Sequence, residues 1–216
     1  DRVRMSDVEL DSGGFIRSMA SRGSLGGLSK TAAEAADVLD AAGMDIILME
    51  TVGVGQSELD IARAADTTVV VLVPESGDAV QAMKAGLMEI ADIFVMNKAD
   101  RAGAEQAIQA ITTILGLRQG TPRQPPVIAT VALEGKGVTG VAEAIASHRA
   151  SLQVDDGLTR KRHERLEQRV ADLVIDRVRR HLWTPGRRRQ LSEGVADILR
   201  GTRTPYDVAH DLVESF

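Results

Sequence analysis

Cysteine is absent from this chain of 216 residues, and aromatic residues make up only 2% of it. The absence of cysteine excludes disulfides, thiolate catalysis and cysteine-bound metals. The four histidines occur without metal-ligand spacing, so no histidine metal site is expected; they are His148, His163, His181 and His210. Because hydrophobic residues still reach 44%, the chain can form a sizeable core, and that core has to be aliphatic.

Long hydrophobic runs are also missing. No segment approaches the roughly 20 uncharged apolar residues of a membrane span, and no amino-terminal signal of charged then apolar residues is present. We therefore expect a soluble, cytoplasmic protein without a membrane partner. Residues 159–190 hold eleven Lys or Arg against four Asp or Glu. This stretch can contact phosphates or an acidic partner, but a solvated helix face is the favoured interpretation, and no nucleic-acid partner is expected.

Short β-rich runs alternate with helical stretches over residues 1–152. This order predicts an α/β fold of the P-loop GTPase type, with a mostly parallel sheet flanked by helices. The run at 67–73 lacks polar alternation, which predicts a strand buried on both faces. The expected strands are 45–50, 67–73, 93–97 and 127–131, and the expected helices are 29–42, 78–90, 104–115 and 137–151.

The tetrapeptide Asn97-Lys98-Ala99-Asp100 directly follows an apolar strand and predicts guanine recognition. The Asp100 carboxylate can accept from both the ring N1–H and the exocyclic amine of guanine, which adenine does not offer together. Asn97 and Lys98 are expected to brace the loop and cover the base. The pattern predicts GTP and GDP as ligands.

Two further segments occur in the order that a GTPase requires. The run at 45–50 ends in Glu50, with Gly53 three residues later, which is the layout of a switch II segment. Glu50 can reach Mg²⁺ or its water shell, and the Gly53 amide can approach a γ-phosphate because no side chain intervenes. After the strand at 127–131, the backbone N–H groups of Val131, Ala132 and Leu133 are candidates to face the guanine carbonyl oxygen.

A phosphate loop of the pattern G-x-x-x-x-G-K-[ST] is missing. The nearest stretch, residues 24–31, has serine at both glycine positions and follows no strand. The strand that precedes a phosphate loop is normally central in such sheets, and the sequence begins at Asp1. We therefore expect that strand and its loop to lie upstream of Asp1.

Residues 153–216 read as a helical extension. Six apolar residues fall at spacings of three and four and give a helix with one apolar stripe: Leu166, Val170, Leu173, Val174, Val178 and Leu182. Residues 184–186 are expected to end this helix, and shorter helices are expected at 191–199 and 206–213. The stripe predicts either packing on the chain's own GTPase domain or a subunit interface, and both alternatives remain open.

Five segments together resemble the GTPase chaperones of adenosylcobalamin-dependent methylmalonyl-CoA mutase, the MeaB type, often labelled as transport-system kinases. They are residues 1–5, 21–27, 50–58, 77–86 and 97–100. The resemblance implies that Asp1 in switch I and Glu50 in switch II are Mg²⁺ ligands. It further implies a third mobile segment in which Asp78, Gln81 and Lys84 rearrange beside the partner mutase, and a homodimer to which the carboxy-terminal helices contribute.

The residue after Gly53 is Val54, where small Ras-like GTPases carry a glutamine that orients the attacking water. A valine side chain cannot orient water. We therefore expect slow hydrolysis by the protein alone and completion of the site by the partner, with Lys84 stabilising charge on the transferring phosphoryl group. Two other functions stay open: a GTPase chaperone that inserts nickel, and a non-catalytic scaffold that binds a partner through the helical extension.

Overall fold

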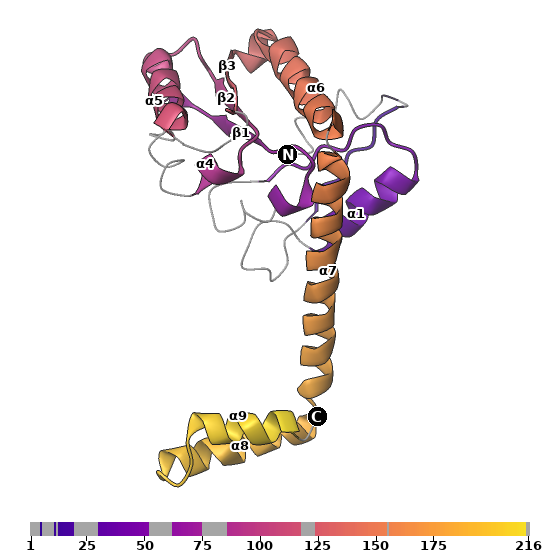
Figure 1. Cartoon of the computed structure of the whole chain (residues 1–216), viewed down its shortest axis with the longest axis vertical. Coiled ribbons are helices and arrows are strands. Elements are labelled where there is room, and N and C mark those ends of the chain that lie inside the picture. The colour runs from indigo at the N-terminus through magenta and orange to yellow at the C-terminus, as the bar shows by residue number, and fades with distance from the viewer. Residues whose placement is uncertain are drawn as a thin grey trace. The chain divides into compact units, whose positions relative to one another are not determined.

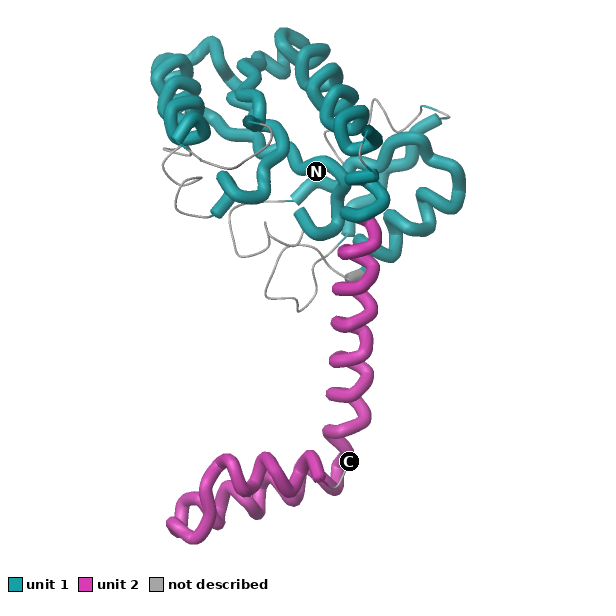
Figure 2. The backbone as a smooth tube through the Cα atoms, in the orientation of Figure 1, with its two compact units in different colours: residues 1–161 teal, residues 162–216 magenta. Residues whose placement is uncertain are grey.

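The computed structural model describes residues 5, 11, 13–19, 30–51, 62–74, 86–117, 124–154 and 156–214. The packing of its Cα atoms divides the chain into two compact units, residues 1–161 and residues 162–216 (Figure 2). The first unit contains the sheet, and the second is helical. None of the helices in the described ranges is both long enough and apolar enough to cross a membrane.

Three parallel strands form the sheet of the first unit (Figure 1). They are β1 (Val69–Leu72), β2 (Ile93–Asn97) and β3 (Val127–Thr130), in the order β1-β2-β3. Val71 pairs with Val95, and Val95 pairs with Ile128. The predicted α/β fold with a parallel sheet is confirmed, and the parallel arrangement brings the carboxyl ends of all three strands to one edge.

Helices cover both faces of this sheet. The described helices of the first unit are α1 (Lys30–Ala41), α4 (Leu87–Ile90), α5 (Ala104–Leu117) and α6 (Val138–Val154). One face of the sheet joins α4 and α5 in a common core around Phe94 and Met96, which are fully buried. In Figure 1, α5 and α6 lie on opposite sides of the strands. The helices predicted near α1, α5 and α6 are confirmed, with ends that differ by at most three residues.

One predicted strand is absent, and another is present but less buried than expected. Residues 45–50 form no strand, because a strand needs a neighbouring ladder and the described residues provide none there. Ile46 and Leu48 are accordingly 75% and 86% exposed. The run at 67–73 was expected to be buried on both faces, yet in β1 the residues alternate and Val71 is 59% exposed. β1 lies at one edge of the described sheet, and the face of β1 that carries Val71 is open to solvent.

The predicted helix at 78–90 is interrupted. Gly86 has φ 73° and ψ 4°, which is left-handed, and α4 begins only after it at Leu87. A left-handed residue cannot lie inside a right-handed helix, so the helix described in this stretch, α4, is only four residues long. Residues 75–85 lie outside the part of the chain that the structure describes.

The second unit consists of the greater part of α7 (Gly157–Leu182) followed by α8 (Pro185–Leu199) and α9 (Pro205–Glu214). The predicted end of the long helix is confirmed. α8, however, begins six residues before the expected start at 191, because Thr184 caps it: its Oγ1 accepts from the N–H of Arg187 at 3.3 Å, and Pro185 occupies the first helical position. α8 and α9 then pack together, with Gly194 against Val208.

Candidate functional site

Asn97 ties together the two loops that leave the carboxyl ends of β2 and β3. Its Oδ1 accepts a hydrogen bond from Thr130 Oγ1 at 3.2 Å and another from the N–H of Ala132 at 3.1 Å. The backbone adds a third link, since the N–H of Ala99 donates to the carbonyl of Thr130 at 3.0 Å. The expectation that Asn97 braces this loop is thus matched by bonds that span 35 positions in the sequence.

The turn after β2 presents its charged residues to solvent. Lys98 has φ 56°, a left-handed conformation, and its carbonyl accepts from the N–H of Arg101 at 3.0 Å. Lys98 and Asp100 are both exposed. A left-handed lysine costs roughly 1–2 kcal/mol, and the bonds around Asn97 and Ala99 hold the chain in place there.

The segment after β3 folds back on itself. The N–H of Val131 donates to the carbonyl of Lys136 at 3.0 Å, closing an isolated antiparallel bridge. Between them lies a short 3₁₀ helix, η3 (Ala132–Glu134). The side chain of Leu133 is fully exposed. The segment therefore stands beside the Asn97 turn as a small, internally bonded loop.

The three candidate N–H groups of this loop differ in their availability. That of Val131 is used in the bridge to Lys136, and that of Ala132 is used at the exposed rim by Asn97. The N–H of Leu133 makes no hydrogen bond among the described residues. Of the three candidates, the N–H of Leu133 is therefore the one best placed to donate to a ligand carbonyl.

Glu50 is exposed and lies nine residues after the end of α1. It takes part in an interaction with its surroundings. The other predicted site residues on the phosphate and metal side lie outside the described residues: Asp1, Gly53, Asp78, Gln81 and Lys84. In the described ranges no group of three or more His, Asp and Glu residues is arranged to hold a metal ion.

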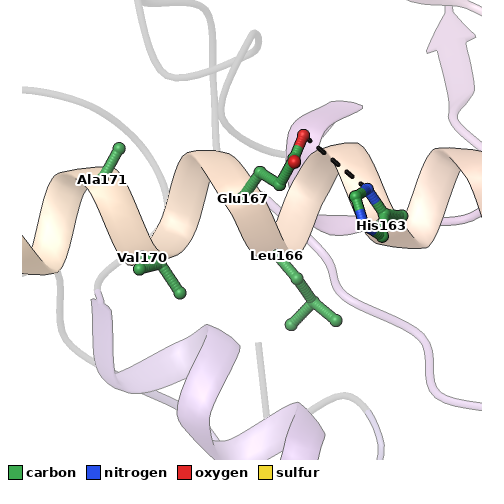
Figure 3. A pocket seen from close by; sticks show the side chains of 5 residues that line it. All are labelled: His163, Leu166, Glu167, Val170 and Ala171. Atoms are coloured by element: carbon green, nitrogen blue, oxygen red, sulfur yellow. Dashed lines mark ion pairs between the residues drawn. The ribbon is translucent and has the colours of Figure 1, made fainter.

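A shallow hollow of about 420 Å³ lies along α7 (Figure 3). Leu166 and Val170 line it with His163, Glu167 and Ala171. In Figure 3 the ion pair between His163 Nδ1 and Glu167 Oε2, at 3.7 Å, runs along the helix while Leu166 and Val170 project from another side. None of the predicted nucleotide-site residues lines this hollow, so it is not part of the predicted nucleotide site.

The family relationship follows from comparison with known proteins. The family model described as "Methylmalonyl Co-A mutase-associated GTPase MeaB" matches residues 1–187. The chain belongs to the MeaB family. The match includes every segment on which the sequence resemblance rested, and it extends through the whole of α7 into the start of α8.

Individual relatives agree with this membership. A protein of Pyrococcus horikoshii that bears a GTPase name is 50% identical over 178 residues, covering 81% of this chain and 56% of the relative. The mouse protein named "Methylmalonic aciduria type A homolog, mitochondrial" is 32% identical over 222 residues, covering 100% of this chain and 54% of its own length. This MeaB-family chain thus spans little more than half the length of these relatives.

A solved structure shows the same fold. The crystal structure of an LAO/AO transport system kinase superposes with a TM-score of 0.68 at 28% sequence identity. The similarity covers 85% of this chain and 61% of the other. The parallel sheet described above is therefore part of the P-loop GTPase architecture of the MeaB family.

Proposed function

We propose that the protein is a Mg²⁺-dependent GTPase that converts GTP to GDP and phosphate. The observation that carries this proposal is the Asn97 brace, which joins the turn bearing Asp100 to the loop bearing Ala132 and Leu133. Such an arrangement offers a guanine ring a carboxylate on one side and backbone donors on the other.

Guanine recognition follows from the chemistry of these groups. The exposed Asp100 carboxylate accepts from the ring N1–H and the exocyclic amine, while the N–H of Leu133 donates to the carbonyl oxygen. The aliphatic part of Lys98, held outward by its left-handed backbone, covers the face of the base. Adenine reverses the donor and acceptor positions, so this set rejects it.

Magnesium fits the carboxylates available. Mg²⁺ is usually held by one or two carboxylates together with waters and substrate phosphates, and needs no all-protein cluster. Glu50 supplies an exposed oxygen ligand of that kind, and Asp1 is proposed as the second. When bound, the ion would neutralise charge on the β- and γ-phosphates.

The hydrolysis step is proposed to depend on the partner. Gly53 would approach the γ-phosphate, while Val54 provides no group to orient water. We assign completion of the site to Asp78, Gln81 and Lys84, with the ammonium of Lys84 stabilising the transferring phosphoryl group.

The proposed partner is an adenosylcobalamin-dependent methylmalonyl-CoA mutase, with the GTPase acting as a chaperone that gates cofactor loading and protects the mutase. The description of the family and the name of the mouse relative support this client. We further propose a cytoplasmic homodimer, in which residues 153–216 supply part of the subunit contact. A nickel-inserting chaperone is less well supported because cysteine is absent and the histidines are scattered.

Calorimetric titration with GDP and with ADP tests the proposal on the complete protein encoded by the gene. We expect GDP to bind and ADP to bind much more weakly. Asp100→Ala should weaken GDP binding by about tenfold to a hundredfold, because a hydrogen bond to a charged group contributes about 1.5–3 kcal/mol, and it should erase the preference over ADP. Asp40→Ala, which removes an exposed carboxylate from α1, is the matched control and should bind like the wild type.

The same preparations report the reaction. Phosphate release from GTP should be slow for the protein alone and faster with the mutase present. Rapid turnover without a partner would contradict the role given to the segment of Lys84. If no preparation binds a guanine nucleotide, the protein is a scaffold and the GTPase proposal is wrong.

A further inference from the structure

A polar cluster lies at the amino-terminal ends of β1 and β2, the edge of the sheet opposite the Asn97 loops. Asp92 directly precedes β2, and its Oδ2 accepts from the N–H of Thr68 at 2.8 Å. Its Oδ1 lies 3.3 Å from Nε2 of His148 in α6, and its Oδ2 lies 3.5 Å from Nζ of Lys161 in α7. Lys161 also donates to the carbonyl of Asp66 at 2.8 Å.

The imidazole of His148 bridges two strand ends. A carboxylate only accepts hydrogen bonds, so Nε2 of His148 carries the proton that faces Asp92, and Nδ1 is left to accept from Thr67 Oγ1 at 2.9 Å in the neutral ring. The side chains of His148, Asp92 and Lys161 are 12%, 23% and 33% exposed. These contacts are therefore partly shielded from solvent and are stronger than an open surface pair.

β2 and α6 are joined at both ends. At one end Asn97 of β2 accepts from Ala132, six residues before α6 begins. At the other end Asp92 meets His148, which lies ten residues into α6 and so about 15 Å along its axis. Between these ends β2 is buried along its length, so it moves as one piece.

We propose that Asp92, His148 and Lys161 form a clasp that couples the guanine-binding loops to the start of α7. A ligand that tightens the contact between Asn97 and the loop of Ala132 restricts β2 and α6 together, and the clasp passes that restriction to Lys161. This inference rests on the proposed guanine-nucleotide site. It assigns to Asp92 and Lys161 a positioning role, since neither touches the nucleotide.

The order hydroxyl, imidazole and carboxylate also occurs in hydrolytic triads. Here Asp92 is occupied by Thr68 and Lys161 as well as His148, and His148 is largely covered. The hollow on α7 and a second one beside Thr112 and Pro126 are lined by none of the clasp residues. The cluster is better suited to holding elements together than to receiving a substrate.

Amide hydrogen exchange on the complete protein, with and without GDP, tests the clasp. In the wild type we expect GDP to slow exchange of the backbone amides around Lys161, at the start of α7, by about fivefold or more, the lower range of allosteric coupling. Lys161→Met keeps the aliphatic stem and removes the ammonium, and it should abolish this protection while exchange in residues 97–101 still responds to GDP. Asp92→Asn keeps an acceptor for Thr68 and should act in the same way.

Arg180→Met is the matched control, because it removes an exposed ion pair with Asp176 from the same helix. It should keep the full response at the start of α7. The clasp is overturned if the wild type binds GDP without protecting these amides, or if Lys161→Met and Asp92→Asn protect them as the wild type does. A wild type that binds no guanine nucleotide refutes the proposed function and the coupling with it. In that case, exchange without nucleotide still tests whether the clasp holds the start of α7. We expect this exchange to be faster in Lys161→Met than in the wild type.

Discussion

Gly137 closes the loop that follows β3, and its backbone leaves no space for a side chain. It has φ 77°, and a Cβ atom there would lie 2.2 Å from the carbonyl oxygen of Ala129. Gly135, two residues earlier, is also left-handed, with φ 69°, but a Cβ atom there would meet nothing within 4 Å. A substitution at Gly135 therefore costs only the energy of the left-handed conformation, whereas a substitution at Gly137 also costs the energy of the close contact with Ala129.

We predict that Gly137→Ala destabilises the protein more than Gly135→Ala. The left-handed conformation costs alanine about 1–2 kcal/mol at either position, and overpacking against Ala129 adds about 1–3 kcal/mol at residue 137 alone. Urea unfolding measures the difference in the free energy of unfolding. Equal destabilisation by both substitutions would show that the end of β3 shifts to accommodate the methyl group without a loss of stability.

At this scale, the sequence pattern was sufficient to place Asn97 and Asp100 at a strand end. It did not distinguish Val131 from its neighbours as a backbone donor. That distinction depends on the bridge from Val131 to Lys136 and on the bond from Ala132 to Asn97. The first joins two backbone groups, and in the second a backbone N–H is the donor; every residue type except proline carries such an N–H, so no side-chain pattern predicts which one is used.

Among the elements, α9 has a capping box at its start. The N–H of Thr204 donates to Asp207 Oδ2 at 2.8 Å, and its hydroxyl donates to the same oxygen at 2.7 Å. In return the N–H of Asp207 lies 3.2 Å from Thr204 Oγ1. The hydrogen bonds from the Thr204 side chain and backbone hold the pKa of the Asp207 carboxyl below its ordinary value of 3.8, and Arg203 adds to the effect.

A lowered pKa in the folded state means that this contact stabilises α9 above pH 3.8 and is lost as the pH falls through the folded value. We predict that the first turn of α9 loses exchange protection over that acidic range. In Asp207→Asn the step should be absent, because no carboxyl titrates there. An NMR titration of the Asp207 carboxyl gives its pKa directly, and Thr204→Val should move that pKa back toward the ordinary value. A pKa unchanged by Thr204→Val would contradict the capping explanation.

Element types were predictable because the helical and strand periods are local. The ends were less so. The sequence Thr184-Pro185 predicts the end of one helix, and the structure also uses it as the cap and first residue of the next. The strand predicted at 45–50 shows a second limit: an apolar run favours a strand, but only pairing with a neighbouring strand makes it one.

At the scale of the whole molecule, the apolar stripe of α7 is exposed. Its side chains at Leu166, Val170, Leu173, Val174 and Val178 are 43% to 59% exposed. An apolar face of this length favours association, and it supports the proposed homodimer.

We predict that Val170→Glu weakens dimerisation by about a hundredfold or more. Each of two copies would lose roughly 1.4 kcal/mol of apolar burial and would bring a carboxylate into the contact. Sedimentation velocity over a concentration series measures the change. Gln168→Glu adds the same charge two residues away, on a different side of the helix, and should leave the dimer intact. A wild type that is monomeric at all concentrations would refute the assignment of this stripe.

The sequence by itself determined the fold class and the family, and it predicted which residues read guanine. Each of these depends on signals within a few positions: alternating β-rich and helical runs, and a tetrapeptide at a strand end. Such signals can be recognised even in a chain that spans little more than half the length of these relatives.

Only the tertiary structure decided which groups these elements bring together. Asp92 and Lys161 are 69 positions apart, and nothing near either residue marks it as the other's partner. Their contact exists because parallel strands place all their amino-terminal ends at one edge, where α6 and the start of α7 pass. Long-range pairing depends on packing geometry, and local sequence encodes the elements that pack but not the side chains that meet.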